Sequence, residues 1–125
     1  MEIVCLDLEG VLVSEIWIEV SHRTSIPGLA RTTRDEPDYA KLMRGRIELL
    51  AQNNLGLSDI QHVIAQMRPL DGAREFLDAL RTQTQVVILS DTYYEFAAPL
   101  MCQLGYPTLF CHELVVDDSG RVRDY

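Results

Sequence analysis

The chain has 125 residues, of which 47% are hydrophobic and 24% charged, a balance typical of one small soluble globular domain with a real core. Lys and Arg number 11 against 19 Asp and Glu, and the formal net charge of -8 argues against a nucleic-acid partner, because phosphates require a basic face. No segment is long enough to span a membrane, no signal peptide is visible, and the scattered cysteines lack zinc-site spacing, so we expect a cytoplasmic protein with reduced thiols.

Residues 2–8 form a short, continuous apolar run, the pattern of a strand buried on both faces of a parallel sheet. This strand leads into the motif Asp7-Leu8-Glu9-Gly10-Val11-Leu12. In open α/β sheets the loop after a strand's carboxyl end is where ligands bind, so two carboxylates here predict an active site. The alternative, that Asp7 caps a turn and Glu9 points to water, is not excluded by this motif alone.

The stretch from Ser14 to Arg68 is too long for one crossover helix and predicts an inserted helical subdomain. One of its helices is expected over 38–53, with an inward face formed by Tyr39, Leu42, Met43, Arg46 and Leu50. Another is expected to begin at a capping box of Ser58 and Gln61 and to end at Pro69.

The chain then returns to the sheet through a predicted helix that begins near Asp71 and buries Phe76, Leu77 and Leu80. Residues 85–90 are a second apolar run, which predicts a strand that ends in Ser90-Asp91-Thr92. The acids and hydroxyls of this second strand should lie at the same sheet edge as those of the first.

The end of the chain predicts one more helix and a hairpin. Thr92 and Glu95 form a capping-box pattern that should open a helix ending at Gly105. Residues 108–116 predict a third strand, and the turn Asp117-Asp118-Ser119-Gly120 predicts a returning strand over 121–125.

These residue types suit phosphoryl transfer. Asp7 can act as a nucleophile that forms an aspartyl-phosphate, and Glu9 can donate a proton to the leaving oxygen and later take one from water. Ser90 can hold a phosphate oxygen, helped by the N–H groups of the helix expected to begin at Thr92. A second interpretation of Thr92, that it is only an N-cap, is compatible with this role.

Two residues of the insertion are candidates for substrate recognition. Arg46 lies on the apolar face of its helix, where its stem can pack while its head reaches solvent, or where its guanidinium can face the cleft and bind a carboxylate. Glu15, close after the first motif, can pair with a substrate ammonium.

With these pieces in place, the chain resembles phosphatases of the haloacid dehalogenase (HAD) superfamily. Asp7-Leu8-Glu9-Gly10-Val11-Leu12 is similar to the first motif of that superfamily and Ile88-Leu89-Ser90-Asp91-Thr92 to the second. The resemblance is closer to the phosphoserine phosphatase branch, and within it to the bifunctional phosphoserine phosphatase/homoserine phosphotransferase type. It extends over Asp91-Thr92-Tyr93-Tyr94-Glu95-Phe96 and Gln103-Leu104-Gly105-Tyr106-Pro107-Thr108.

The resemblance implies an α/β fold in which residues 1–13 and 69–125 form a Rossmann-like parallel sheet core and residues 14–68 form a small helical cap. It implies roles for each site residue: Asp7 as the nucleophile and a Mg²⁺ ligand, Glu9 as the acid/base with its carbonyl on the metal, and Ser90 and Asp91 at the phosphoryl group and substrate. It further assigns Glu15, Met43 and Arg46 to the binding of a small phosphorylated amino acid.

The chain departs from the family pattern beyond the second motif. The family continues with a lysine and a Gly-Asp-x-x-x-Asp loop, whereas this sequence has no lysine after Lys41. We therefore expect a C-terminally truncated core, a first strand left as an exposed apolar edge, and weak binding of Mg²⁺.

Three functions are considered for such a chain. The first is a Mg²⁺-dependent phosphatase or phosphotransferase that acts on phosphoserine, with a homodimer as one arrangement. The second is a catalytically inactive remnant that binds a ligand or partner. The third, a receiver domain with a phosphorylated Asp, is disfavoured because receivers have no long insertion between their first two strands.

Overall fold

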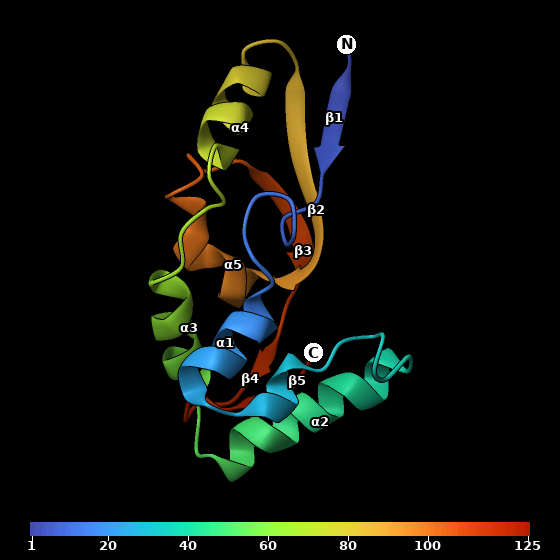
Figure 1. Cartoon of the computed structure of the whole chain (residues 1–125), viewed down its shortest axis with the longest axis vertical. Coiled ribbons are helices and arrows are strands. Elements are labelled where there is room, and N and C mark those ends of the chain that lie inside the picture. The colour runs from blue at the N-terminus through green and yellow to red at the C-terminus, as the bar shows by residue number, and fades with distance from the viewer.

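The computed structural model describes residues 1–125 as an α/β structure in which helices and strands mix along the chain (Figure 1). In chain order the elements are β1 (Ile3–Leu6), α1 (Ile16–Thr24), the short 3-10 helix η1 (Pro27–Ala30), α2 (Tyr39–Gln52), α3 (Leu57–Ala65), α4 (Ala73–Arg81), β2 (Gln85–Tyr93), α5 (Tyr94–Met101), β3 (Thr108–His112), β4 (Val115–Val116) and β5 (Val122–Asp124).

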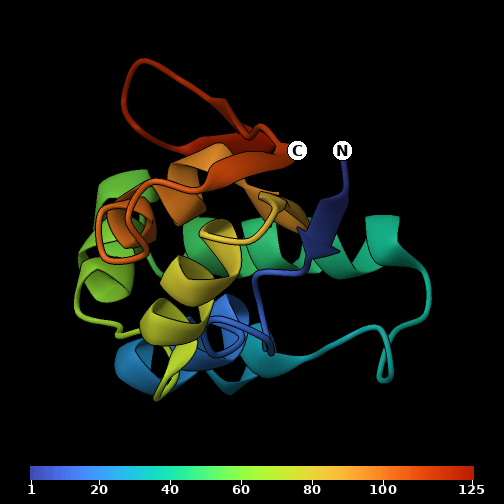
Figure 2. The ribbon, with the colours of Figure 1, turned by 90° about the horizontal axis from the view of Figure 1, so that it is seen from above.

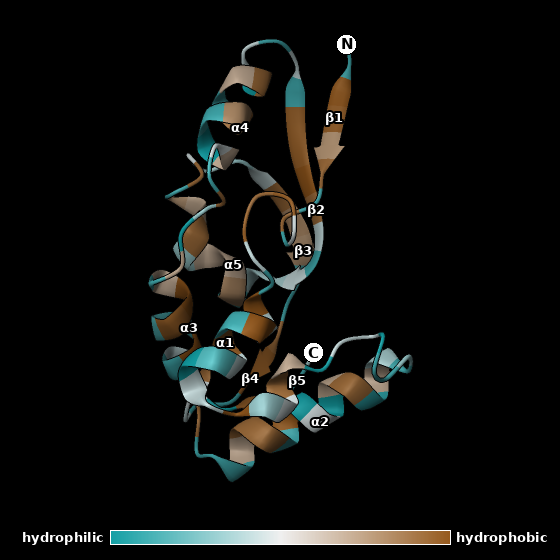
Figure 3. Cartoon of the chain, viewed as in Figure 1, coloured by the Kyte–Doolittle hydropathy of each residue, from teal (hydrophilic) through white to brown (hydrophobic).

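The central sheet has three parallel strands in the order β1-β2-β3, which confirms the predicted α/β class. Leu6 pairs with Ile88, and Ile88 pairs with Leu109, so the carboxyl ends of all three strands meet at one edge. Helices α4 and α5 lie on one side of this sheet (Figure 1), and β1 lies at its edge, as predicted. Hydrophobic colour runs along β1 and β2 (Figure 3), as expected for strands of a parallel sheet.

The insertion leaves and re-enters the core at neighbouring points. Val13 forms an antiparallel bridge with Pro69, and the Leu70 N–H donates to the Leu12 carbonyl at 2.8 Å. Helices α1, α2 and α3 lie below the three-stranded sheet in Figure 1, at the end from which the insertion departs, and Figure 2 shows the same helices from above. The division into a core of 1–13 and 69–125 and a cap of 14–68 stays a prediction, which this pairing supports.

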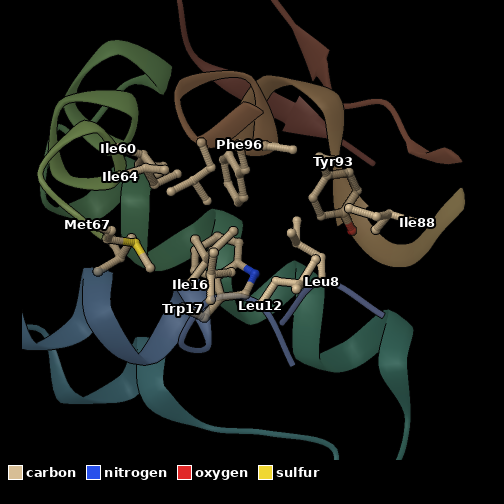
Figure 4. Close-up of a cluster of buried hydrophobic side chains, with 14 of the residues drawn as sticks. Leu8, Leu12, Ile16, Trp17, Ile60, Ile64, Met67, Ile88, Tyr93 and Phe96 are labelled. Carbon is tan, nitrogen blue, oxygen red and sulfur yellow. The ribbon is translucent and has the colours of Figure 1, made fainter. Parts of the chain in front are cut away.

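Cap and core share one apolar interior. A single cluster of 23 buried hydrophobic residues includes members from α1, α2, α3, α4, β2 and α5 (Figure 4). At its centre Trp17 of α1 meets Phe96 of α5 edge to face, with ring centroids 5.2 Å apart. Since close-packed interiors resist rearrangement, this shared core holds the cap at a fixed place over the sheet.

Two predicted capping boxes are wrong. Helix α5 begins at Tyr94 instead of Thr92, because β2 continues to Tyr93 and the Glu95 carboxylate accepts from the Leu114 N–H at 3.2 and 3.1 Å. Helix α3 begins after Gly56, whose N–H donates to Asp59 Oδ2 at 2.8 Å.

The other predicted elements are present, with two differences in detail. The N-cap of α2 is Asp38, whose side chain accepts from the Lys41 N–H, and the expected β4–β5 hairpin is present. The expected third strand is interrupted and forms β3 and then β4.

Phe76 was expected to be buried, yet it is 51% exposed, because α4 turns only Ala73 and Leu77 fully into the core. All three cysteines are free. No helix combines the length and the apolar character that crossing a bilayer requires.

Phe96 and Phe110 offer a matched test of the shared core, because Phe96 is 1% exposed and Phe110 is 56% exposed. Phe96→Ala should lower the free energy of unfolding by about 3–5 kcal/mol, since it leaves a cavity between cap and core. Phe110→Ala should change it by about 0.5 kcal/mol. Urea unfolding measures both, and equal losses would contradict a core centred on Phe96.

Candidate active site

The first wall of the site is the loop that follows β1. Leu8 is fully buried and anchors this loop, which places Asp7 and Glu9 on either side of it. Gly10 adopts a φ of 76°, a conformation that side chains with a Cβ rarely adopt, and its N–H donates to the Val13 carbonyl at 2.7 Å. The tight turn directs Glu9 back toward α1, where the Ile16 N–H donates to Glu9 Oε2 at 2.9 Å.

The second wall is the carboxyl end of β2. The pairing of β2 with β3 is irregular between Leu89 and Tyr93, so the strand bends where Ser90 and Asp91 occur. The Thr92 N–H donates to Ser90 Oγ at 3.3 Å, and the Thr92 side chain is buried. The parallel pairing of β1 with β2 brings this bend beside the Asp7 loop.

The two walls and the cap enclose a pocket of about 240 Å³. Six of the seven site residues predicted from sequence line it, together with seven further residues. The predicted ones are Asp7, Glu9, Glu15, Arg46, Ser90 and Asp91; the others are Trp17, Thr32, Thr33, Tyr39, Leu42, Thr92 and Tyr93. The pocket therefore combines carboxylates, hydroxyls and one buried guanidinium.

Arg46 takes the second of its two predicted positions and lies in the cleft. It is only 7% exposed, and its guanidinium carbon lies 4.7 Å from the Trp17 ring centroid. Nη2 donates to the Arg31 carbonyl at 2.7 Å and Nη1 to the Met43 sulfur at 3.6 Å, while Nε has no partner. The guanidinium is thus a buried positive charge in the wall of the pocket, and such a group is suited to bind an anion.

Met43 is the one predicted site residue that does not line the pocket. It is fully buried in the core cluster, because only part of the inward face of α2 lines the pocket and the rest packs in the core. Its contact with the pocket is indirect, through the sulfur that accepts from Arg46. The structure thus places Met43 behind Arg46, so that it would affect a ligand in the pocket only through Arg46.

Burial shifts the ionisation of the two central charged groups. Desolvation raises the pKa of Glu9, the hydrogen bond from the Ile16 N–H offsets part of this rise, and the nearby Glu15 carboxylate adds to it. Desolvation also lowers the pKa of Arg46, against the opposing influence of Tyr39 and of Glu9. A carboxyl group that keeps its proton to higher pH is suited to donate it to a leaving oxygen.

Sequence reasoning missed several lining residues. Thr32 and Thr33 come from the segment between η1 and α2, which has no pattern that points to a ligand. Tyr39 was placed on the inward face of α2 without a role, and Tyr93 was assigned to the helix after the second strand instead of to the end of β2 itself. Their positions in the sequence could have indicated both residues: Tyr39 shares a helix face with Arg46, and Tyr93 directly follows Thr92.

The fit of this site to Mg²⁺ is incomplete. Asp7 is an exposed carboxylate and Asp91 lines the same pocket, and Mg²⁺ prefers such oxygen ligands. Yet no three His, Cys, Asp or Glu side chains come together anywhere in the chain in a way that could hold a metal ion. The residues present do not by themselves build a metal centre.

Comparison with known proteins gives strong matches by sequence. The phosphoserine phosphatase ThrH of Pseudomonas aeruginosa is 61% identical over all 125 residues. A phosphoserine phosphatase of Pseudomonas syringae pv. tomato is 58% identical over the same residues. The chain spans 61% and 53% of the lengths of these two relatives. No family model matches the sequence.

Solved structures agree in fold. The crystal structure of phosphoserine phosphatase from T. onnurineus superposes with a TM-score of 0.73 at 19% identity, covering 98% of this chain and 62% of that one. A phospho-aspartyl intermediate analogue of phosphoserine phosphatase superposes with a TM-score of 0.68 at 18% identity, covering 98% of this chain and 61% of that one. At such identities the likeness concerns the fold.

The raised pKa of Glu9 predicts a pH-dependent effect of Glu9→Gln on stability. The folded state binds the Glu9 proton more tightly than the unfolded state does. The stabilisation that this provides is therefore lost as the pH rises above 4.5, the pKa of Glu9 in the unfolded state. Glutamine can keep an oxygen for the Ile16 N–H and cannot ionise. Its effect on the free energy of unfolding, relative to the parent chain, should therefore become more favourable between about pH 4 and about pH 7.

Urea unfolding at both pH values measures this difference, and Glu2→Gln at the exposed N-terminus is the control, which should show no such trend. A Glu9→Gln difference that stays constant with pH would show that Glu9 is not desolvated as described.

Proposed function

We propose that this chain acts on phosphoserine as a phosphomonoester hydrolase and phosphotransferase through an aspartyl-phosphate, because it is 61% and 58% identical over its whole length to two phosphoserine phosphatases. The observation that carries the proposal is the single pocket in which Asp7 and Glu9 face the recognition pair Glu15 and Arg46. The comparison with a phospho-aspartyl intermediate analogue supports the covalent route.

In the first step an Asp7 carboxylate oxygen attacks the phosphorus of the substrate. The bond from phosphorus to the serine oxygen breaks, and Glu9 in its protonated form, which burial favours, transfers its proton to that oxygen. Serine leaves with its hydroxyl restored, and the phosphoryl group remains on Asp7 as an acyl phosphate. The Ser90 hydroxyl lines the same pocket and can donate to a phosphoryl oxygen.

In the second step Glu9, now ionised, takes a proton from water as the water oxygen attacks phosphorus. The bond to Asp7 breaks, inorganic phosphate leaves, and both carboxyl groups return to their starting states. When the hydroxyl of homoserine replaces water, the same sequence yields phosphohomoserine, which is the transferase form of the reaction.

Recognition of the amino acid falls to the cap. Arg46 presents its buried guanidinium, which lines the pocket, to the substrate carboxylate. Glu15, which lies at the start of α1 and lines the pocket, pairs with the ammonium group. The two groups of opposite sign match a zwitterion, which favours a phosphorylated amino acid over a simple phosphate ester.

Dependence on Mg²⁺ is part of the proposal on the ground of the family resemblance alone. The side chains of this chain do not assemble a metal centre, so both steps above are carried by Asp7 and Glu9. We expect any dependence to be of low affinity, because Asp7 and a backbone carbonyl provide few ligands.

Asp7→Asn tests the covalent route. Phosphate release from L-phosphoserine, measured with and without Mg²⁺, should fall to background in this variant because an amide is not a nucleophile. Asp118→Asn, in the exposed hairpin turn, is the control and should release phosphate at the parent rate. Release that persists in Asp7→Asn would exclude the aspartyl-phosphate, and a folded parent chain without release would favour a binding role.

Glu9→Asp tests the balance between water and alcohol as acceptors. The longer side chain of Glu9 shifts the proton donor relative to an Asp at this position and is expected to favour transfer to an alcohol. Shortening it should raise the ratio of phosphate to phosphohomoserine formed in the presence of homoserine. An unchanged product ratio would show that the length of residue 9 does not govern the choice.

A further inference from the structure

Two tyrosine hydroxyls join the cap to the sheet at the rim of the pocket. Tyr39 is the first residue of α2, Tyr93 is the last residue of β2, and their hydroxyl oxygens lie 2.7 Å apart. This is the only hydrogen bond between α2 and the three-stranded sheet. Residues 54 positions apart in the chain thus meet across the boundary between cap and core.

The sheet side of this pair is rigidly held. Tyr93 is 2% exposed, and its ring meets Phe96 edge to face at 5.6 Å, so it belongs to the same core as the Trp17–Phe96 contact. Desolvation and the bond to Tyr39 both raise the pKa of Tyr93, which keeps its hydroxyl protonated and able to take part in the pair. The sheet therefore presents a fixed hydroxyl to α2.

The cap side is more exposed. Tyr39 is 38% exposed, and its ring packs edge to face with that of Tyr125 at a centroid distance of 5.7 Å. Helix α2 packs on η1 and β5 and buries Leu42 and Met43, and the Tyr39 hydroxyl adds a hydrogen bond that fixes its amino-terminal turn to the sheet. Arg46 follows Tyr39 by seven residues, about two helical turns, so both lie on the same face and line the same pocket.

We propose that Tyr39 and Tyr93 are positioning residues that hold α2 against the sheet and so set Arg46 at the distance from Asp7 and Ser90 required by a substrate carboxylate. The inference rests on the proposed function, since it concerns the carboxylate selectivity of that site. The pair would thereby favour compounds with a carboxylate near the phosphoryl group over phosphate esters without one.

Substrate comparison separates positioning from general stability. L-phosphoserine and phosphoethanolamine share a phosphoryl group and an ammonium, and only the first has a carboxylate. Tyr39→Phe and Tyr93→Phe should each lower the ratio of kcat/KM for phosphoserine over phosphoethanolamine by about 3- to 10-fold, the range expected for one lost hydrogen bond. The loss should lie in KM for phosphoserine, because the reacting groups are untouched.

Three controls test whether the loss of selectivity comes from this one hydrogen bond. Tyr39→Phe with Tyr93→Phe should reduce selectivity no further than either change alone, because both remove one bond. Tyr106→Phe, at a residue 73% exposed and remote from the pocket lining, should leave selectivity unchanged. Tyr39→Phe should lower the urea midpoint more than Tyr93→Phe, since it leaves the buried Tyr93 hydroxyl without a partner.

A binding measurement distinguishes failure of this inference from failure of the proposed reaction. Trp17 is the only tryptophan and lines the pocket, so its fluorescence can report Kd for phosphoserine and for phosphoethanolamine without turnover. A loss of binding selectivity in both phenylalanine variants supports the inference even if phosphate is never released. Unchanged selectivity in the variants, or a parent chain that does not prefer the carboxylate ligand, overturns it while leaving phosphate release to be judged separately.

Discussion

The contact between Trp17 and Phe96 is the interaction on which the rest of this structure depends. It joins the first helix of the insertion to the helix that follows β2, and the apolar cluster around it is continuous from cap to sheet. A cap attached only at its two connections with the core would be free to swing about them. Packed into a common interior, it becomes the third wall of a pocket whose other walls are the ends of β1 and β2.

That arrangement places charged groups where water is scarce. Glu9 and Arg46 both lose solvation, and each responds in the direction that favours its neutral form. The backbone around them supplies partial compensation, from the Ile16 N–H to Glu9 and from the Arg31 carbonyl to Arg46. The guanidinium of Arg46 remains a positive charge in the pocket wall that an anionic ligand can neutralise. The same desolvation that makes the site costly to fold makes it able to bind an anion and to hold a proton.

Local patterns were sufficient where the order of apolar and turn-forming residues defines an element. The apolar runs predicted β1 and β2, the expected helix over 38–53 is close to α2, and the Asp117–Gly120 turn predicted the hairpin. The capping boxes failed because their side chains have partners elsewhere in the chain: Glu95 accepts from Leu114, and Gln61 donates to the Glu95 carbonyl. A capping pattern is local in sequence, but the competition for its side chains is decided by packing.

The sequence by itself determined that acids and hydroxyls gather in one pocket, because the residues that end two apolar strands meet at one edge of a parallel sheet. Asp7, Glu9, Ser90 and Asp91 needed no more than that rule. Only the tertiary structure decided which cap residues reach the pocket, because one helix face offers both core and cleft positions: Arg46 faces the cleft while Met43, three residues earlier, is buried behind it. It alone brought the hydroxyls of Tyr39 and Tyr93 together, since no local pattern links two residues whose meeting depends on how the cap packs on the sheet.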